Sequence, residues 1–571
     1  MPKKTFTIEQ LLYLLMISLG LFVRFINLGD LPLSDSEAKV SLAALSLISG
    51  NYEGFLTDQI FLANILGILF YLFGHGDVVA RFFPAAIGSV FILTPALFRN
   101  YFDRRILVIL SFWIAISPTF VSMSRQVDSS ILFLFSITLF VFFFIKKSAS
   151  FSAIFLVVSL LCGKVFFWNL VPVVVSMIYV YFFSNRNEYS PIIQILERVK
   201  EFHWKKFGIY FLGSYALIST FVLIFPRQFS GLGNSFVSYL EIWSLPSITI
   251  FSDLVRGLFF YEIAAIVFGL FGMVLILRKN QFAGLFLIGI MTFTTVQIIL
   301  VAEKNIVWNI WIVLPLMISG SYFINKYVSL PKYVSAKIVI ISLISLAILF
   351  FISLAFMSMF SNVNQINQDN SLRVFFIVAG FALIIGAGLL VGWAISWEIA
   401  GKSFLFLFIS YFFIFTISAS WNASGLRHPF YNEILRINEV PIESNLLIST
   451  LQDYSEWNYG DKNTLKIFVV NYSKPSLIWS LRNFSNVNYV SVIPQFDSID
   501  AIITDVNQNV VQGNAFRGQE ILWTSKPAWK LMISSELTQW FLTRRAPQDM
   551  LFQQSLIVWI RNDLFPGTET N

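Results

Sequence analysis

Two carboxylates and an amine follow the first hydrophobic segment of the chain at close spacing. The run Leu33-Ser-Asp35-Ser-Glu37-Ala-Lys39 begins directly after Pro32. A carboxylate beside a hydroxyl group can act as a general base, and a charge at the edge of a bilayer must be paired, hydrated or used. Asp35 and Glu37 are therefore the catalytic candidates. Asp35 is the preferred base, because a helix is predicted to begin there with Ser34 or Asp35 as its cap, which fixes a side chain in place.

The composition is that of a membrane protein. Of the 571 residues, 57% are hydrophobic and 12% are charged, whereas about 25% are charged in a typical soluble domain. Apolar stretches of roughly 17–25 residues recur from Leu11 to Ile417, and each can cross a bilayer. The net charge of +7 fits lysines and arginines that anchor cytoplasmic loops, so no nucleic-acid partner is expected.

Basic residues set the predicted orientation. Lys3 and Lys4 precede the first span and place the N-terminus in the cytoplasm. The later basic clusters remain cytoplasmic only if Leu56–Phe73 lies in the outer interface without crossing and if Phe151–Phe183 is two short spans broken at Gly163-Lys164. The sequence therefore predicts a polytopic α-helical membrane protein of about thirteen spans.

The same orientation defines two domains. Residues 1–420 form the predicted transmembrane domain, in which residues 29–77 are a first outer loop with interfacial helices. Residues 421–571 are more polar and are predicted to form an extracytoplasmic α/β domain of the βαβ kind. Its predicted strands and helices are Lys466–Val470, Ser476–Phe484, Tyr489–Ile493, Ala501–Thr504, Glu536–Arg544 and Leu556–Ile560.

With this topology, polar residues far apart in the sequence share the outer face. Besides Asp35 and Glu37 they are Lys39, Arg81, Arg125, Asp128, Lys164, Arg227, Tyr261, Glu262, Glu303, Lys304 and Trp308. They predict an outward-facing cavity whose basic residues suit an anionic headgroup and whose carboxylates suit acid–base chemistry. Taken singly, an outer Arg or Lys can simply reach lipid phosphates, and Glu303-Lys304 can be a solvated pair. Glu262 lies within a span, where an ionisable group is functional by default.

A metal site is only weakly indicated. Asp35 and Glu37, together with Asp30, can bind a divalent cation through oxygen, but they do not make a full ligand set. The three histidines are isolated in the sequence, which is not the spacing of a zinc site. A divalent metal is therefore an open possibility, and no other cofactor is expected. The single cysteine, Cys162, excludes an intrachain disulfide.

The order of these motifs resembles the GT-C class of glycosyltransferases, particularly the protein O-mannosyltransferases and the lipid A aminoarabinose transferases. The resemblance covers most of the membrane part and is strongest over the first 130 residues. The matching pieces are Leu31-Pro-Leu-Ser-Asp35-Ser-Glu37-Ala, Phe73-Gly, Ala80-Arg81-Phe-Phe-Pro84-Ala-Ala-Ile-Gly88, Ser117-Pro118, Ser124-Arg125, Asp128, Tyr261-Glu262, Glu303-Lys304, Trp308 and Leu314-Pro315.

The resemblance implies an enzyme of a bacterial or archaeal plasma membrane. Such an enzyme transfers a sugar, with inversion, from a polyprenyl-phosphate donor to a protein, glycan or lipid acceptor on the extracytoplasmic face. An acidic residue of the first outer loop is the base in these families. That role maps to Asp35 or Glu37, which are separated here by a serine where the families have adjacent Asp-Glu. The donor phosphate maps to Lys164, Arg227 and Lys304, since a fixed cation stabilises the leaving phosphate.

Two other classes of function fit parts of the pattern. A transporter or flippase for a lipid-linked or anionic substrate would place polar residues near the bilayer midplane in paired halves, whereas here they gather on one face. A non-enzymatic assembly factor would have no need for Asp35 and Glu37 opposite basic residues. The glycosyltransferase is the preferred interpretation.

Overall fold

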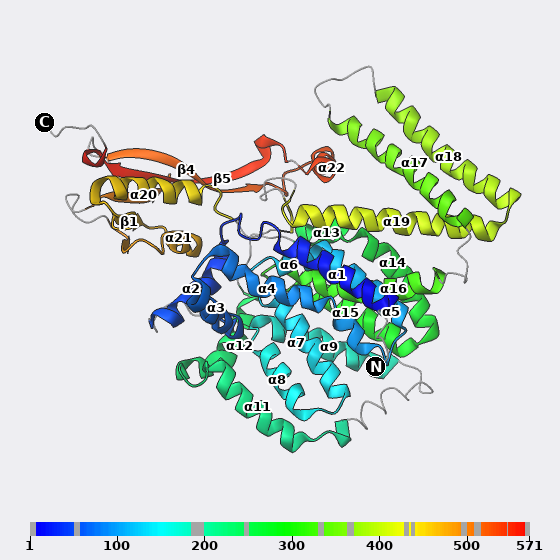
Figure 1. Cartoon of the computed structure of the whole chain (residues 1–571), viewed down its shortest axis with the longest axis horizontal. Coiled ribbons are helices and arrows are strands. Elements are labelled where there is room, and N and C mark those ends of the chain that lie inside the picture. Colours follow the sequence, from blue (N-terminus) through cyan, green and yellow to red (C-terminus); the bar gives the residue numbers. More distant parts are fainter. Residues whose placement is uncertain are drawn as a thin grey trace, which may run out of the picture.

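The computed structural model describes most of the chain. The described residues are 7–50, 57–183, 199–244, 251–328, 336–361, 370–426, 433–435, 440–492, 499–506, 516–544 and 546–565. The start of the predicted interfacial helix, within residues 51–56, and the last residue of one predicted strand, Ile493, lie outside them. A helical bundle forms most of the molecule, and a small sheet lies at one end of it, at the left of Figure 1.

The first half of the bundle carries the predicted first loop as a pair of helices packed side by side, α2 (Asp35–Ser49) and α3 (Ile60–Phe73). The other helices of this half are α1 (Ile8–Phe25), α4 (Asp77–Phe91), η1 (Thr94–Phe98), α5 (Arg104–Ile116), α6 (Pro118–Ser124), α7 (Ser130–Ile145), α8 (Ala149–Leu160), α9 (Lys164–Phe183) and α11 (Trp204–Ser219). The predicted break at Gly163-Lys164 is confirmed, since α8 ends before it and α9 begins at Lys164. Gly163 has a φ of +84°, a left-handed conformation that glycine adopts without a steric penalty.

The second half of the bundle ends in the helical hairpin α17–α18, which projects beside α19 in Figure 1. The elements of this second half are η3 (Pro226–Ser230), α12 (Gly231–Glu241), α13 (Phe251–Tyr261), α14 (Ile263–Lys279), α15 (Gln281–Leu300), η4 (Ile306–Asn309), α16 (Ile310–Tyr327), α17 (Ala336–Ser361), α18 (Asn370–Ala394) and α19 (Trp397–Ala423).

Helix length and composition make this an integral, multi-pass membrane protein. Within the described ranges, 8 helices are long and apolar enough to cross a membrane, or 10 if each of two bent pairs is one span. The bent pairs are α5–α6, with a bend of 58°, and α13–α14, with a bend of 85°. The count of about thirteen spans and the outward orientation stay predictions.

The C-terminal part forms a mixed five-stranded sheet in the order β2-β1-β3-β5-β4. Its strands and helices are α20 (Ser444–Tyr459), β1 (Lys466–Val470), α21 (Pro475–Ser480), β2 (Asn486–Val490), β3 (Ala501–Asp505), β4 (Phe516–Pro527), α22 (Ser534–Thr543) and β5 (Leu551–Arg561). Strand β1 pairs in parallel with β2 and β3, while β5 is antiparallel to β3 and β4. The predicted βαβ unit is therefore present as β1–α21–β2, whereas α20 and β4 were not predicted.

The helical bundle and the C-terminal sheet each have a hydrophobic core. The sheet packs on α20 through side chains such as Leu447, Ile467 and Trp523. Trp529 and Trp540, from the C-terminal part, instead belong to the core of the bundle with Tyr261. The C-terminal part is thus anchored on the membrane helices as well as on its own sheet.

The topology prediction can be tested by cysteine labelling. Gly76→Cys adds a Cβ with nothing closer than 4.0 Å, and Arg104 is exposed, so neither change disturbs packing. A membrane-impermeant maleimide applied to intact cells should label Gly76→Cys but not Arg104→Cys. The native thiol of Cys162 is buried, which keeps the background low. The reverse labelling pattern would overturn the predicted orientation.

Candidate functional site

Glu37 is held from all sides in the interior. Helix α2 begins after its cap residue Ser34, whose backbone N–H and hydroxyl both donate to Glu37 Oε2 at 3.0 Å. Arg81, on α4, makes a two-bonded ion pair with the same carboxylate, with 2.8 Å from Nε to Oε1 and 2.8 Å from Nη2 to Oε2. The backbone N–H of Val127 donates to Oε1 at 3.1 Å. Both oxygens are therefore committed to holding the first loop on the bundle.

This environment keeps Glu37 ionised. Burial by itself would raise the pKa of Glu37, but the charge and hydrogen bonds of Arg81 and the backbone N–H groups outweigh it and lower the pKa to about 2. Arg81 in turn donates to the carbonyl groups of Leu28, Leu31 and Pro32, so all five of its N–H donors have partners. A buried, fully hydrogen-bonded pair of this kind is costly to break from one side.

Asp35 has a different environment. It is the first residue of α2 and is half-buried, and its Oδ1 accepts the backbone N–H of Ser476 at 3.0 Å. Ser476 belongs to α21, which Figure 1 shows against α2. No donor among the described residues contacts Oδ2 of Asp35. One oxygen of this carboxylate is thus oriented by the C-terminal part, and the other can meet a substrate.

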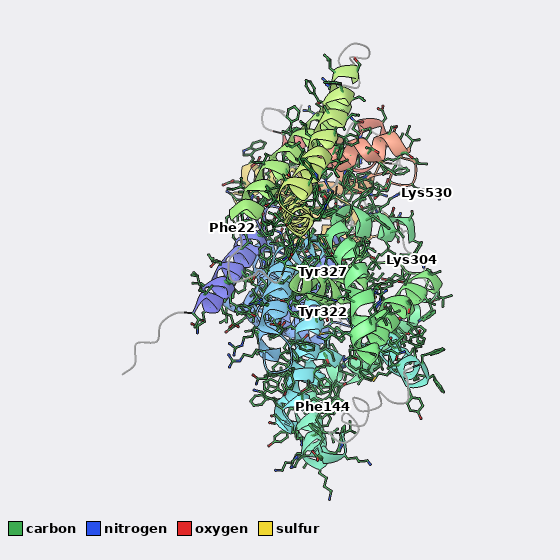
Figure 2. All side chains as sticks on the ribbon, turned by 90° about the vertical axis from the view of Figure 1, so that its right-hand side faces the viewer. Phe22, Phe144, Lys304, Tyr322, Tyr327 and Lys530 are labelled. Atoms are coloured by element: carbon green, nitrogen blue, oxygen red, sulfur yellow. The ribbon has the colours of Figure 1, made fainter. Side chains whose placement is uncertain are left out.

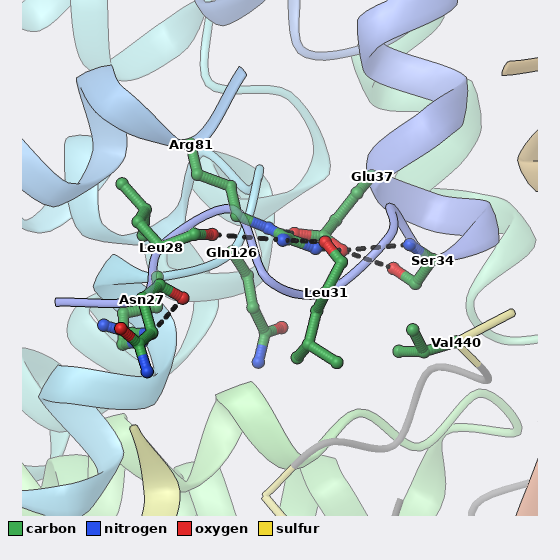
Figure 3. Close-up of a pocket in the computed structure, with 9 residues that line it drawn as sticks. Asn27, Leu28, Leu31, Ser34, Glu37, Arg81, Gln126 and Val440 are labelled. Carbon is green, nitrogen blue, oxygen red and sulfur yellow. Dashed lines mark hydrogen bonds and ion pairs between the residues drawn. The ribbon is translucent and has the colours of Figure 1, made fainter. Parts of the chain in front are cut away.

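A small polar cavity lies beside the ion pair, shown in Figure 3. Its cavity volume is about 20 Å³, and it is lined by Asn27, Leu28, Leu31, Ser34, Glu37, Arg81, Arg125, Gln126 and Val440. Val440 reaches it from the C-terminal part, and the side chains of Leu31 and Gln126 extend into it. Three of the predicted cavity residues, Glu37, Arg81 and Arg125, are therefore brought together here.

Arg125 and Arg24 satisfy carbonyl groups at helix ends. Arg125 donates to the carbonyl oxygens of Val23, Arg24, Ile26 and Asn27, where α1 ends. Arg24, which is 0% exposed, donates to Ile114 at 3.1 Å and Ala115 at 3.2 Å, where α5 ends. The carbonyl of Ile114 would normally bond to the N–H four residues on, but that residue is Pro118, which has none.

Glu262 accepts hydrogen bonds from the start of α6, on the other side of the break between α5 and α6. It lies at the bend between α13 and α14, is 1% exposed, and accepts from Ser117 Oγ at 2.5 Å and from the backbone N–H of Thr119 at 3.1 Å. The two bent helix pairs thus meet at their breaks. The structure gives Glu262 a role in joining these breaks, and its Oε2 has no described partner.

The adjacent Tyr261 points to the C-terminal part. Its hydroxyl donates to Glu433, which also pairs with Arg544 at 3.5 Å. The guanidinium of Arg544 lies over the rings of Tyr261 and Trp540 at 4.8 Å from each centroid. Glu433 and Arg544 were not predicted from the sequence, and they tie the tail to α13 in a buried position.

A second polar cluster forms where α3, α7, α9 and α15 meet. Lys164 Nζ pairs with Glu303 at 2.7 and 3.0 Å, and its backbone N–H donates to Asp58 at 3.1 Å. Asp128 accepts from Gln59 at 3.4 Å and from the backbone N–H of Ser130 at 2.9 Å, at the start of α7. Asp58 and Gln59 were not among the predicted site residues.

The remaining predicted residues are more scattered. Lys304 Nζ donates to the carbonyl oxygens of Ile298 and Ile299, at 2.6 and 3.1 Å, and to that of Val301, where α15 ends. Arg227, on η3, and Lys39, on α2, are exposed. Trp308 is buried and stacks on Trp168 with ring centroids 4.0 Å apart. The residues that were predicted to line one cavity are therefore divided between the cavity beside the Glu37–Arg81 pair and the cluster around Lys164.

An apolar groove runs between α13, α14, α15 and α16. Its cavity volume is about 230 Å³, and apart from Thr295 and Asn309 its lining is hydrophobic. Phe251 and Phe259, on α13, are 39% and 53% exposed, so the groove opens to the surface of the bundle. Ile298 lines it and also offers its carbonyl to Lys304. Figure 2 shows Lys304 on one flank of the molecule and Phe22 on the opposite one.

The donor set does not fit the metal possibility raised for Asp35 and Glu37. The two oxygens of Glu37 bind a guanidinium, and the structure, over the residues it describes, places no group of three or more His, Cys, Asp or Glu side chains to hold an ion.

Comparison with solved structures identifies the fold. The match with ArnT from Cupriavidus metallidurans bound to undecaprenyl phosphate has a TM-score of 0.51 and 14% identity, and covers 86% of this chain and 93% of that one. ArnT is a lipid A aminoarabinose transferase of the GT-C class. The chain has the GT-C fold.

Other GT-C structures match this fold with lower scores. The same ArnT in the apo state has a TM-score of 0.47 and 13% identity, over 86% of this chain and 93% of that one. The Archaeoglobus fulgidus oligosaccharyltransferase in the apo form has a TM-score of 0.46 and 11% identity, over 87% of this chain and 69% of that one. No protein-family model and no curated protein matches the sequence.

The Glu37–Arg81 pair predicts a pH-dependent stability of this GT-C protein. Because the folded pKa of Glu37 is below its ordinary value, the pair stabilises the fold above about pH 4.5, and this contribution is lost as the pH falls toward 2. Glu37→Gln should lower the free energy of unfolding at pH 7 by about 3–5 kcal/mol, since it leaves Arg81 buried without its charge partner.

Melting temperatures of the detergent-purified protein measured from pH 3 to pH 7 check this. The wild type should lose stability toward acid, and Glu37→Gln should be less stable at pH 7 with a flatter profile. Lys39→Gln, an exposed change on the same helix, is the control and should follow the wild type. Equal melting of Glu37→Gln and wild type at pH 7 would contradict the structural role of the pair.

Proposed function

We propose that this protein is a glycosyltransferase that moves a sugar from a polyprenyl-phosphate donor to an acceptor on the extracytoplasmic face, with inversion. The observation that carries the proposal is the apolar groove of α13–α16, which opens to the bundle surface and has a cation at one end. A polyprenyl chain needs such a groove, because its apolar surface gains nothing from water. The GT-C fold, shared with an ArnT that binds undecaprenyl phosphate, supports the same reaction.

The donor phosphate is assigned to three cations, which are Lys304 beside the groove, Lys164, and Arg227 on η3. The ammonium group of Lys304 lies at the end of α15, where its charge acts on a phosphate even while its N–H groups cap the helix. Lys164 is paired with Glu303, and it binds the donor phosphate when the phosphate replaces the carboxylate of Glu303. Arg227 is exposed, and the structure gives its side chain no partner within the described ranges. A cation at this place stabilises the charge that develops on the leaving phosphate.

Asp35 is assigned as the base. In a single displacement the acceptor oxygen bonds to the anomeric carbon as the bond from that carbon to the phosphate oxygen breaks. The phosphate leaves with the electron pair, and the hydroxyl proton passes to the carboxylate. One displacement inverts the configuration. Glu37 is not suited to this role, because both its oxygens are bound by Arg81 and backbone groups.

An assay with purified protein and a panel of polyprenyl-phosphate sugars tests the proposal. At least one donor should yield free polyprenyl phosphate and a sugar-bearing acceptor. Asp35→Asn should lower turnover by about two orders of magnitude, because asparagine cannot take a proton, while its side-chain oxygen still accepts from Ser476. Donor binding and melting temperature should stay as in the wild type.

The comparison with Glu37 makes the assignment specific. Glu37→Gln is expected to lose stability together with activity, whereas Asp35→Asn loses activity alone. Normal turnover of Asp35→Asn would remove it as the base. No release of polyprenyl phosphate from any donor by the wild type would contradict the proposed function itself.

The phosphate assignment is tested by removing one cation at a time. Lys164→Gln, Arg227→Gln and Lys304→Gln should each weaken binding of undecaprenyl phosphate by about ten- to a hundredfold, since a charge-assisted contact contributes roughly 1.5–3 kcal/mol. Affinity is measured with the purified protein in nanodiscs. Lys402→Gln, which removes a lysine paired with Glu398 on the surface of α19, is the matched control. Unchanged affinity in all three variants would make these residues ordinary anchors to the lipid headgroups.

A further inference from the structure

Helix α21 of the C-terminal part is docked on the first loop around Asp35. Its Ser476, which is 2% exposed, donates its backbone N–H to Asp35 Oδ1 at 3.0 Å, over a separation of 441 residues in the sequence. The donor is buried, whereas the acceptor carboxylate is partly exposed. The carboxylate proposed as the base is therefore oriented by a segment outside the membrane helices.

Trp479 fixes α21 in this place. The indole is 2% exposed, and its Nε1–H donates to Asp77 Oδ1 at 2.7 Å, at the start of α4. Its ring lies 5.7 Å from that of Phe70, on α3, and belongs to a cluster of buried side chains from α2, α3 and α4. A large buried ring with its polar atom satisfied is a strong and directional anchor.

Arg482 closes the contact on the other side. Its guanidinium lies 4.0 Å from the centroid of the Trp479 ring and donates to the carbonyl of His75 at 2.9 and 3.2 Å. One turn of helix and the residues after it thus touch α2, α3 and the turn before α4. A rigid arrangement of this kind is what holds a catalytic group within the narrow limits that transfer requires.

The two carboxylates of the loop are held by different parts of the protein. Glu37 is held by Arg81 within the bundle, whereas Asp35 is held by Ser476 in the C-terminal part. With Oδ1 fixed, Oδ2 has a defined direction, and the structure gives Oδ2 no donor within the residues it describes. The C-terminal part therefore does more than cover the site.

We propose that α21 is part of the transfer site, with Trp479 as a positioning residue that keeps the Ser476 N–H on Asp35. This inference rests on the proposed function, since it assigns the positioning of the same base. Trp479 does not touch the substrates. Its loss affects the rate of transfer by releasing Asp35, and the donor groove between α13 and α16 is left intact.

The test compares three variants of the full-length protein. Trp479→Ala should reduce kcat by about tenfold or more, because a shift of about 1 Å in a reacting group costs up to a hundredfold. The KM and binding of the donor should be unchanged. Trp479→Phe keeps a ring in the buried cluster but loses the N–H that Asp77 accepts, so its kcat should fall between those of the wild type and Trp479→Ala. Trp457→Ala is the matched control, since Trp457 is 60% exposed in the same part of the protein.

Hydrogen–deuterium exchange of the peptide that contains Ser476 gives a readout independent of activity. Exchange should accelerate in Trp479→Ala and in Asp35→Ala, but not in Asp35→Asn, which keeps an acceptor for the amide. Should Trp479→Ala fail to fold, Asp77→Ala removes the same hydrogen bond from the other side. It should also accelerate exchange and lower kcat.

The outcomes separate this inference from the proposed function. Accelerated exchange with wild-type kcat would overturn the positioning role, and a raised kcat would show that α21 inhibits the site. Unchanged exchange in both Trp479→Ala and Asp77→Ala would remove Trp479 as the anchor. A wild type that releases no polyprenyl phosphate contradicts the proposed function and the catalytic meaning of the contact, whereas exchange still shows whether Trp479 holds α21 on Asp35.

Discussion

Helix ends inside a membrane bundle need partners for their free backbone groups, and this requirement accounts for several charged side chains of the bundle. No water is present in the bilayer core to satisfy them. At the break between α5 and α6, Arg24 donates to the carbonyl groups of α5 and Glu262 accepts from the first residues of α6. Arg125 does the same for the end of α1, and Lys304 for the end of α15. The polar face of the protein is built on these contacts.

The same requirement distinguishes residues that hold the fold from residues that can act on a substrate. Glu37 and Arg81 satisfy each other and the loop backbone completely, which suits a structural pair. Asp35, two residues away, has one oxygen engaged by the C-terminal part, and no cation of the described residues pairs with it. Neighbouring carboxylates thus acquire separate tasks through their different partners.

The sequence predicts local features of this fold better than long-range pairings. The break at Gly163-Lys164 and strand β1 follow from local composition, and both are present. Strand β4 was missed because it begins with four exposed residues after Phe516, and these lack the hydrophobic alternation of a strand. Arg81, the partner of Glu37, is 44 residues away in the sequence, and Ser476, the partner of Asp35, belongs to the C-terminal part. Such pairings depend on packing that no spacing reveals.

The central claim is that the groove of α13–α16 receives a polyprenyl phosphate. A cryo-electron microscopy structure of the wild type in nanodiscs with undecaprenyl phosphate tests it most directly. The account predicts density for the chain along Phe251 and Leu258, with the phosphate within hydrogen-bond distance of Lys304 or Lys164. Lipid density bound at another place, with this groove free of it, would contradict the account.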